Sequence, residues 1–160
     1  MKRAIYPGTF DPITLGHLDV AQRAAGIFEH LIVAVTARTR KNTLFDCEER
    51  VAMVRAALGD LPNVTVESFS GLLVNYASQR DIRVLVRGIR AFSDFEYEFQ
   101  MALTNRNLAP DVETVFLMPK EEHSYISSSM VKEVASLRGS VEDFVPEPVA
   151  RALVRKYSEA

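Results

Sequence analysis

The sequence predicts an α/β fold, with a doubly wound five-stranded parallel sheet and additional helices in the C-terminal part of the chain. Short apolar segments bounded by turn residues alternate with segments whose apolar residues recur at helical spacing. Parallel strands need crossover connections, which are nearly always right-handed, so this alternation favours a sheet with helices on both faces. We expect the strand order 3-2-1-4-5, in a single domain that covers residues 1–160.

The first two strands and the helix between them are clearly specified. Residues 4–6 and 30–35 are continuous apolar runs, typical of parallel strands that are covered on both faces. Between them, apolar residues recur every three or four positions from 16 to 28, which predicts a crossover helix. This segment therefore forms one β-α-β unit.

The rest of the chain continues the same alternation. Asp46 and Glu49 have capping-box spacing and predict the start of a helix, which Gly59 ends. Ser93 and Glu96 have the same spacing and predict the start of the helix between the last two strands. The remaining strands are expected at 64–66, 84–86 and 115–118, and the remaining helices at 72–79, 127–137 and 148–156.

Composition and charge restrict the classes of function. A formal net charge of -2 provides no general attraction for a nucleic-acid backbone or an anionic membrane, so we expect neither partner. Cys47 is the only cysteine, which excludes an intrachain disulfide and favours a reducing compartment. No uninterrupted apolar run approaches the roughly 18 residues of a membrane span. We therefore expect a cytoplasmic protein that recognises anions through local basic residues.

The loop after the first strand carries the first candidate site. Gly8 allows close backbone approach to a ligand, Thr9 adds a hydroxyl group, and the following helix start presents unpaired N–H groups. Gly16 removes a side chain beside His17, so the imidazole can donate a hydrogen bond to a phosphoryl group as charge develops. The alternative is that the Pro-Gly and Asp-Pro pairs only turn the chain and His17 only begins a helix.

Two further motifs follow at the predicted carboxyl edge of the sheet. Arg87 and Arg90 flank a glycine directly after the fourth strand, where a doubly wound sheet has its crevice, and guanidinium groups suit phosphates. A solvated turn is the alternative. Three serines at 127–129 begin a helix, and their hydroxyl groups with the helix N-terminus suit triphosphate oxygens. Helix capping explains one of these serines, not three.

These motifs resemble a known superfamily. Residues 8–12 followed by Thr14-x-Gly16-His17 resemble the T/H-x-G-H signature of the nucleotidyltransferases related to class I aminoacyl-tRNA synthetases. With 87–90, 94–98 and 127–129 in order, nearly all 160 residues resemble the bacterial phosphopantetheine adenylyltransferase family. The resemblance implies a Rossmann-like fold and reversible transfer of the adenylyl group of ATP to 4′-phosphopantetheine, giving dephospho-coenzyme A and pyrophosphate. It also implies Mg²⁺, carried by ATP or pyrophosphate, and a homohexamer.

The resemblance also assigns roles to individual residues. His17, Lys41 and Arg90 match catalytic positions, with His17 stabilising the pentacovalent α-phosphate. The phosphopantetheine contacts are Thr9, Lys41, Leu73 and Arg87. The ATP contacts are Thr9, Phe10, His17, Gly88, Ile89, Arg90, Glu98, His123, Ser124, Tyr125, Ile126, Ser127, Ser128 and Ser129, with Glu98 toward the sugar or base. The role of the His123 side chain stays open.

Several alternatives remain at this level. Arg38, Arg40 and Lys41 are three cations in one loop, and a compact ammonium suits a phosphate that moves in line, which favours Lys41. A cytidylyltransferase or a nicotinamide-nucleotide adenylyltransferase would share the first motif but place different residues after the fourth and fifth strands. A nucleotide-binding regulator without turnover could dispense with His17, Lys41 or Arg87, all of which are present. A nucleic-acid-binding module would show a basic face with exposed stacking aromatics.

Overall fold

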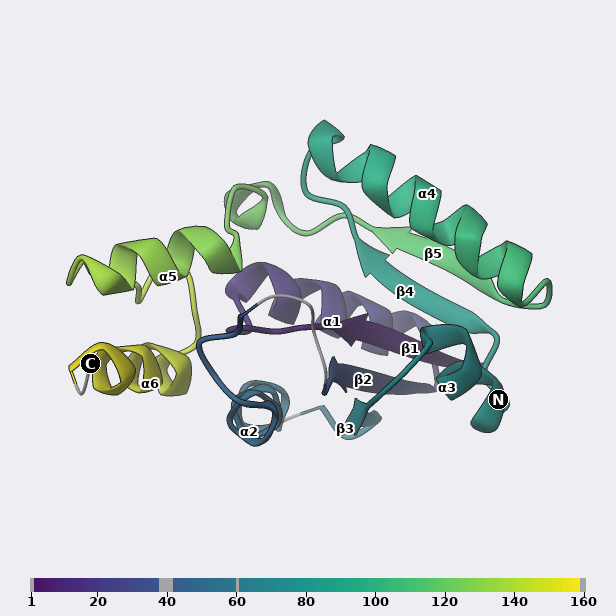
Figure 1. Cartoon of the computed structure of the whole chain (residues 1–160), viewed down its shortest axis with the longest axis horizontal. Coiled ribbons are helices and arrows are strands. Elements are labelled where there is room, and N and C mark those ends of the chain that lie inside the picture. The colour runs from purple at the N-terminus through teal and green to yellow at the C-terminus, as the bar shows by residue number, and fades with distance from the viewer. Residues whose placement is uncertain (1, 38–41, 60, 159–160) are drawn as a thin grey trace.

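In a computed structural model, the chain forms a five-stranded parallel sheet with the order β3-β2-β1-β4-β5, which confirms the predicted topology (Figure 1). The structure describes residues 2–37, 42–59 and 61–158. Each predicted strand is present, with ends that differ by at most three residues from the prediction. The strands are β1 (Arg3–Gly8), β2 (His30–Thr36), β3 (Val64–Phe69), β4 (Val84–Gly88) and β5 (Glu113–Leu117).

Alternate residues of the central strands face two separate apolar clusters. In β1, Ala4 and Tyr6 belong to the larger cluster, whereas Ile5 belongs to the smaller one. The larger cluster contains side chains of α1 (Leu15–Ile27), α2 (Cys47–Leu58), α5 (Ser128–Ser136) and α6 (Glu147–Ser158). The smaller cluster contains side chains of α3 (Leu73–Gln79), which adjoins α4 (Phe92–Leu108). Both faces of the sheet are thus covered, as a parallel sheet requires.

The two predicted capping boxes have different outcomes. Asp46 and Glu49 exchange hydrogen bonds of 2.8 Å between side chain and main chain, which confirms the capping box at the start of α2. The predicted box at Ser93 is wrong, because the N-cap of α4 is Ala91, two residues before the predicted cap, and Ser93 lies inside the first turn. Just before the helix, the main-chain N–H of Arg90 donates to the carboxylate of Asp94 over 3.3 Å.

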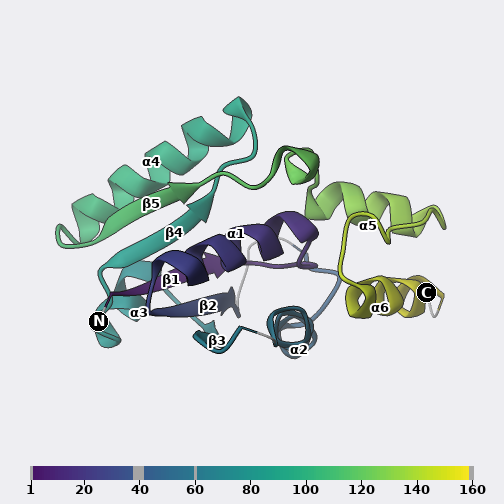
Figure 2. The same cartoon turned by 180° about the vertical axis from the view of Figure 1, so that it is seen from behind.

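The last part of the chain lies beyond the carboxyl ends of the strands, where α5 and α6 pack side by side (Figures 1 and 2). Between β5 and α5 the chain forms the short 3₁₀ helix η1 (Glu121–His123), which the sequence pattern did not predict. The loops after β1 and β4 and the start of α5 therefore meet at one end of the sheet. Within the described ranges, the helices are too short or too polar to cross a bilayer.

Candidate active site

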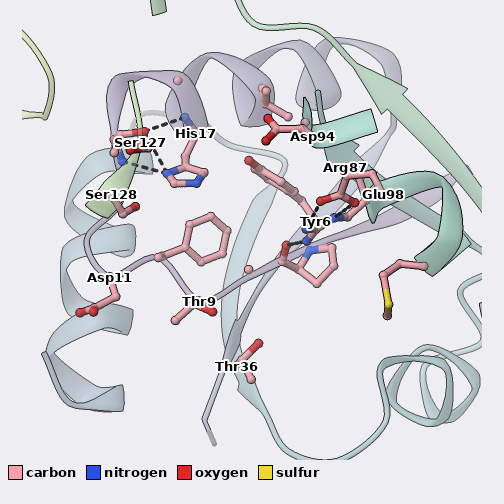
Figure 3. A pocket seen from close by; sticks show the side chains of 18 of the residues that line it. Tyr6, Thr9, Asp11, His17, Thr36, Arg87, Asp94, Glu98, Ser127 and Ser128 are labelled. Carbon is pink, nitrogen blue, oxygen red and sulfur yellow. Dashed lines mark hydrogen bonds and ion pairs between the residues drawn. The ribbon is translucent and has the colours of Figure 1, made fainter. Parts of the chain in front are cut away.

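A cavity of 510 Å³ opens at the carboxyl ends of β1 and β4, where the topology places the crevice of a doubly wound sheet. In Figure 3, His17 and Ser127 lie on one side of it, and Arg87 and Glu98 lie on the other. Among the residues predicted for the site, those that line the cavity are Thr9, Phe10, His17, Leu73, Arg87, Gly88, Arg90, Glu98, Ser127, Ser128 and Ser129.

The loop after β1 is shaped by Gly8 and Phe10. Phe10 has a φ of 51°, a left-handed conformation that turns its ring back over the loop. A Cβ atom on Gly8 would lie 2.7 Å from that ring, so a larger residue would displace the ring. The ring then packs edge-on against Tyr6, with 5.5 Å between centroids, and against His17, with 5.2 Å. This packing holds the imidazole against an apolar wall.

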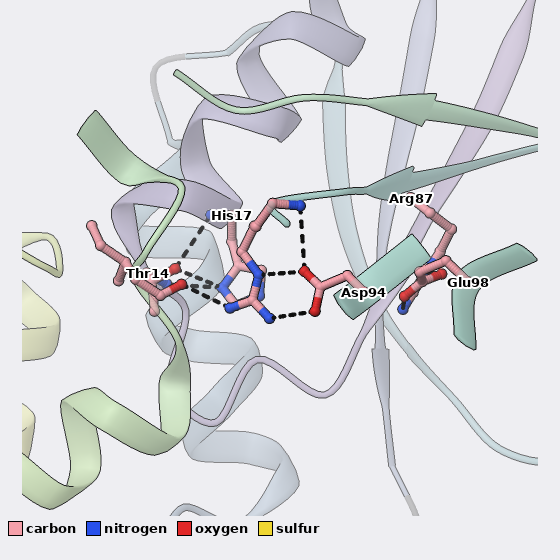
Figure 4. Close-up of polar contacts among 7 residues, drawn as sticks. Thr14, His17, Arg87, Asp94 and Glu98 are labelled. Carbon is pink, nitrogen blue, oxygen red and sulfur yellow. Dashed lines mark hydrogen bonds and ion pairs between the residues drawn. The ribbon is translucent and has the colours of Figure 1, made fainter. Parts of the chain in front are cut away.

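The main chain at the start of α1 holds His17 in one tautomer. The N–H of Thr14 donates to His17 Nδ1 over 3.1 Å, while the Thr14 hydroxyl accepts from the His17 N–H at 3.3 Å (Figure 4). Because an N–H group only donates, Nδ1 must accept, and the ring proton therefore lies on Nε2. Burial, together with the charges of Arg90 and Arg87, lowers the pKa of His17 to about 3. The cavity is therefore lined by a neutral imidazole with one N–H donor.

Asp11 connects three segments, and the sequence placed it in the 8–12 motif and in a turn without assigning it a role. Its carboxylate accepts from the N–H groups of Leu44 and Phe45 at 2.9 and 3.0 Å, and from Lys132 Nζ at 2.8 Å. Asp11 is buried, and Lys132 lines the cavity from α5. No local pattern indicates this pair, because its members are 121 positions apart.

The two arginines after β4 are each held by a carboxylate of α4 (Figure 4). Arg87 makes two hydrogen bonds to Glu98, of 2.8 and 2.6 Å, and a third of 2.8 Å to the carbonyl of Pro7. Arg90 binds Asp94 through Nε at 3.0 Å and the carbonyl of Ile126 through Nη1 at 2.8 Å. The structure thus brings both predicted arginines to the cavity, with guanidinium N–H groups left for a ligand.

The three serines at the start of α5 make different contacts. Ser127 caps α5 by accepting from the N–H of Met130 at 3.1 Å, and Ser128 donates to the carbonyl of Pro12 at 2.8 Å. Ser129 is exposed and also lines the cavity. Capping therefore accounts for Ser127 alone, although all three serines line the cavity at the start of α5.

The other predicted residues are placed differently. Five of them do not line the cavity, namely Ile89, His123, Ser124, Tyr125 and Ile126. His123 instead packs behind Gly16, where a Cβ atom would lie 3.3 Å from its carbonyl oxygen. Glu98 does line the cavity, but its carboxylate accepts from Arg87 in this structure. Lys41 lies outside the described residues, as do Arg38 and Arg40.

The described residues form no cluster of three or more His, Cys, Asp or Glu side chains able to hold a metal ion. The three carboxylates that line the cavity, those of Asp11, Asp94 and Glu98, are each within 3.0 Å of a cationic side chain. This arrangement does not fit a magnesium site built from protein ligands, which uses carboxylates that are available to the ion. It fits the binding of phosphate groups.

Comparisons with known proteins agree with this geometry. The model of the cytidylyltransferase-like family matches residues 5–134. The chain is 57% identical over 157 residues to the phosphopantetheine adenylyltransferase of Desulforudis audaxviator, covering 98% of this chain and 96% of that protein. It is 54% identical over 157 residues to the same enzyme of Moorella thermoacetica, covering 98% of each chain.

The fold is also similar to that of a solved structure, a putative nicotinate-nucleotide adenylyltransferase from Vibrio parahaemolyticus. The two structures agree with a TM-score of 0.73 over 100% of this chain and 98% of the other, at 18% identity. At this identity the match supports the architecture and not a substrate.

Proposed function

The chain belongs to the phosphopantetheine adenylyltransferase family, and we propose that the residues around the cavity perform the family's reaction directly, without a covalent enzyme intermediate. The reaction transfers the adenylyl group of ATP to phosphopantetheine in coenzyme A biosynthesis. We propose that it is reversible, with dephospho-coenzyme A and pyrophosphate as products. The observation that carries the proposal is a neutral His17 placed in one cavity with Arg87, Arg90 and the start of α5.

In the proposed step, an oxygen of the acceptor's 4′-phosphate attacks the α-phosphorus of ATP. The new P–O bond forms as the bond to the bridging oxygen of the β-phosphate breaks, and pyrophosphate leaves in line with its electron pair. The Nε2–H group of His17 donates to the α-phosphate, where negative charge increases in the transition state. Positioning of the two phosphates supplies the rest, so the protein needs no nucleophile of its own.

The phosphates of the two substrates bind different cations of the site. We assign Thr9, Lys41 and Arg87 to the phosphate of phosphopantetheine, and Leu73 to its pantetheine arm. Arg90 and the N-terminus of α5 serve the triphosphate, because the hydrogen bond from Arg90 to the Ile126 carbonyl keeps them together. The described residues that line the cavity supply no ligand set for Mg²⁺, so we propose that the ion arrives on the phosphate oxygens of ATP.

Turnover with three acceptors tests the function. Pyrophosphate release from ATP is measured with phosphopantetheine, nicotinamide mononucleotide and glycerol phosphate as separate acceptors. We expect release only with phosphopantetheine. Release with nicotinamide mononucleotide alone would assign the chain to the other adenylyltransferase activity considered from the sequence. Nucleotide binding without release from any acceptor would indicate a regulator.

We also propose that the protein is a single-domain homohexamer of the cytoplasm. Exposed apolar side chains of α4 support contacts between copies, since Phe95, Tyr97 and Phe99 are 45%, 61% and 48% exposed. The use of ATP and the lone, unpaired Cys47 support the cytoplasmic location. Sedimentation velocity on the wild type and on Phe95→Ser tests the assembly, with a hexamer expected for the first and smaller species for the second.

A further inference from the structure

Tyr6 lines the cavity from β1, although the proposed reaction step gives it no role. The residue is 4% exposed, and its ring packs edge-on against Phe10 within the larger apolar cluster. No described residue forms a hydrogen bond with its hydroxyl group. In the described part of the chain, no fully enclosed side-chain nitrogen or oxygen atom lacks a hydrogen-bond partner. The Tyr6 hydroxyl, which lacks one, therefore opens into the cavity.

The surroundings of this hydroxyl keep it protonated and place it next to β4. A Cβ atom on Gly88 would lie 3.9 Å from the Tyr6 oxygen, so the hydroxyl reaches the end of the neighbouring strand. Burial raises the pKa of the Tyr6 hydroxyl above its ordinary value, although the charges of Arg87 and Arg90 act in the opposite direction. The phenol thus keeps its proton at neutral pH and can donate it in a hydrogen bond.

Tyr6 lies between the groups assigned to the two reacting phosphates. Its ring and that of His17 pack against the same Phe10 ring, with 5.5 and 5.2 Å between centroids. Tyr6 is also close enough to Arg87 and Glu98 for their charges to act on it, and Figure 3 shows it between this pair and His17. In-line attack requires the acceptor's phosphate and the α-phosphate to meet between His17 and Arg87. An unpartnered donor therefore opens where the new bond forms.

We infer that the Tyr6 hydroxyl donates a hydrogen bond to a non-bridging oxygen of the α-phosphate of ATP and, with His17 Nε2–H, stabilises the transition state. The inference rests on the proposed function, which assigns His17 to the α-phosphate and Arg87 to the acceptor's phosphate. A donor held by apolar packing needs no reorganisation when charge increases on the phosphate, and such donors contribute strongly to catalysis. The bound phosphate also gives the buried hydroxyl the partner that buried polar groups normally have.

The test compares two buried tyrosines, each changed to phenylalanine. Tyr6→Phe removes the hydroxyl group and keeps the ring that packs on Phe10. Tyr76→Phe is the matched control, because Tyr76 is 6% exposed and donates to Glu67 over 2.8 Å but does not line the cavity. Turnover at saturating substrates is measured by pyrophosphate release, dissociation constants are measured by calorimetry, and melting temperatures are measured by circular dichroism.

The two variants should show opposite effects. We expect Tyr6→Phe to lower turnover by about tenfold, as loss of a hydrogen bond to a charged group does. The dissociation constants of ATP and phosphopantetheine should change by less than about twofold, because the contact strengthens in the transition state. The melting temperature should not fall, since the unliganded protein loses no hydrogen bond. Tyr76→Phe should keep the turnover of the wild type and melt at a lower temperature.

Two ATP analogues separate the α-phosphate from the ribose. With 2′-deoxy-ATP and with 3′-deoxy-ATP, we expect Tyr6→Phe to lose the same fraction of turnover as with ATP. A loss that disappears with either analogue would place the hydroxyl on the ribose, and selective weakening of phosphopantetheine would place it on the acceptor. Either result would overturn the inference, as would unchanged turnover or a melting temperature lowered as much as in Tyr76→Phe. A wild type that releases no pyrophosphate would contradict the proposed function itself.

Discussion

The two sides of the cavity hold their polar side chains in different ways. On the β1–α1 side, main-chain groups hold His17 and Arg50, and Asp11 is bound by two main-chain N–H groups and by Lys132. On the β4–α4 side, Arg87 and Arg90 each donate to one main-chain carbonyl and also pair with a side-chain carboxylate. A group bound to the main chain moves only with its loop, whereas a carboxylate and a ligand phosphate can compete for one guanidinium. The first side is thus suited to chemistry at a fixed point, and the second to gripping phosphates. Substitution of His17 should therefore affect turnover, and substitution of Arg87 or Arg90 should affect affinity.

The largest effect is expected at His17. His17→Asn places an amide oxygen where Nδ1 lies and keeps an acceptor for the Thr14 N–H, but it lacks the Nε2–H donor. We expect turnover to fall by about 10² to 10³, as loss of one transition-state donor does. ATP affinity and the melting temperature should stay near those of the wild type.

His17→Gln is the matched control for this variant. Its amide nitrogen lies near the position of Nε2 and can still donate, so it should lose less turnover than His17→Asn. If the order is reversed, the acceptor at Nδ1 matters more than the donor, and His17 supports the helix rather than the reaction.

A second prediction concerns the cations between β2 and α2, which the structure does not describe. Lys41→Ala should lower turnover at saturating substrate by at least about tenfold, near 1.4 kcal/mol of barrier. Arg38→Ala and Arg40→Ala should mainly raise the Michaelis constant at low salt, as exposed steering charges do. If Lys41→Ala keeps the turnover of the wild type and Arg40→Ala loses it, the role assigned to Lys41 belongs to Arg40.

A smaller effect separates the two arginines of the second side. Arg87→Ala should weaken phosphopantetheine about fivefold more than ATP, and Arg90→Ala should do the reverse, because charge-assisted contacts to different phosphates are lost. Calorimetry with each ligand measures this difference. Equal effects on both ligands would contradict the assignment of Arg87 to phosphopantetheine and of Arg90 to ATP.

The same pair should also differ in stability. The side chain of Glu98 is 10% exposed and that of Asp94 is 27% exposed, so removing Arg87 leaves the more deeply buried charge without a partner. Arg87→Ala should therefore lower the melting temperature more than Arg90→Ala. Thermal denaturation of both variants beside the wild type measures the difference, and a larger loss for Arg90→Ala would contradict it.

Features of the fold could be predicted from the sequence when the residues in contact lie close together in the sequence. The strands were predictable because burial on both faces leaves continuous apolar runs, and their order followed from the general rule for doubly wound sheets. The capping box at Asp46 is local and was predicted, whereas the one at Ser93 was not formed. Just before α4, Arg90 donates to Asp94 and also to the carbonyl of Ile126, which is 36 positions away in the sequence.

In the candidate site, too, contacts between residues far apart in the sequence could not be predicted. The positions of His17, Arg87 and Arg90 could be predicted because each follows a strand that ends at the same edge of the sheet. The partners could not, because the pairing of Arg87 with Glu98 depends on how α4 returns over β4. The burial of Arg50 depends likewise on where three separate carbonyls converge. Residue type and position in the fold were predictable, but long-range pairing was not.

The central claim is that the β1–α1 side presents a neutral imidazole with its proton on Nε2, and ¹⁵N NMR of the His17 ring tests this most directly. In the folded protein the pKa of about 3 lies below that of an ordinary histidine, so the unfolded chain takes up the proton first. The contribution of His17 to stability is therefore complete above pH of about 6.5 and is lost as the pH falls toward 3. We predict that the ring keeps the chemical shifts of the neutral Nε2–H tautomer from pH 8 down to about 5. A ring that titrates near pH 6.5, or that carries its proton on Nδ1, would contradict the account.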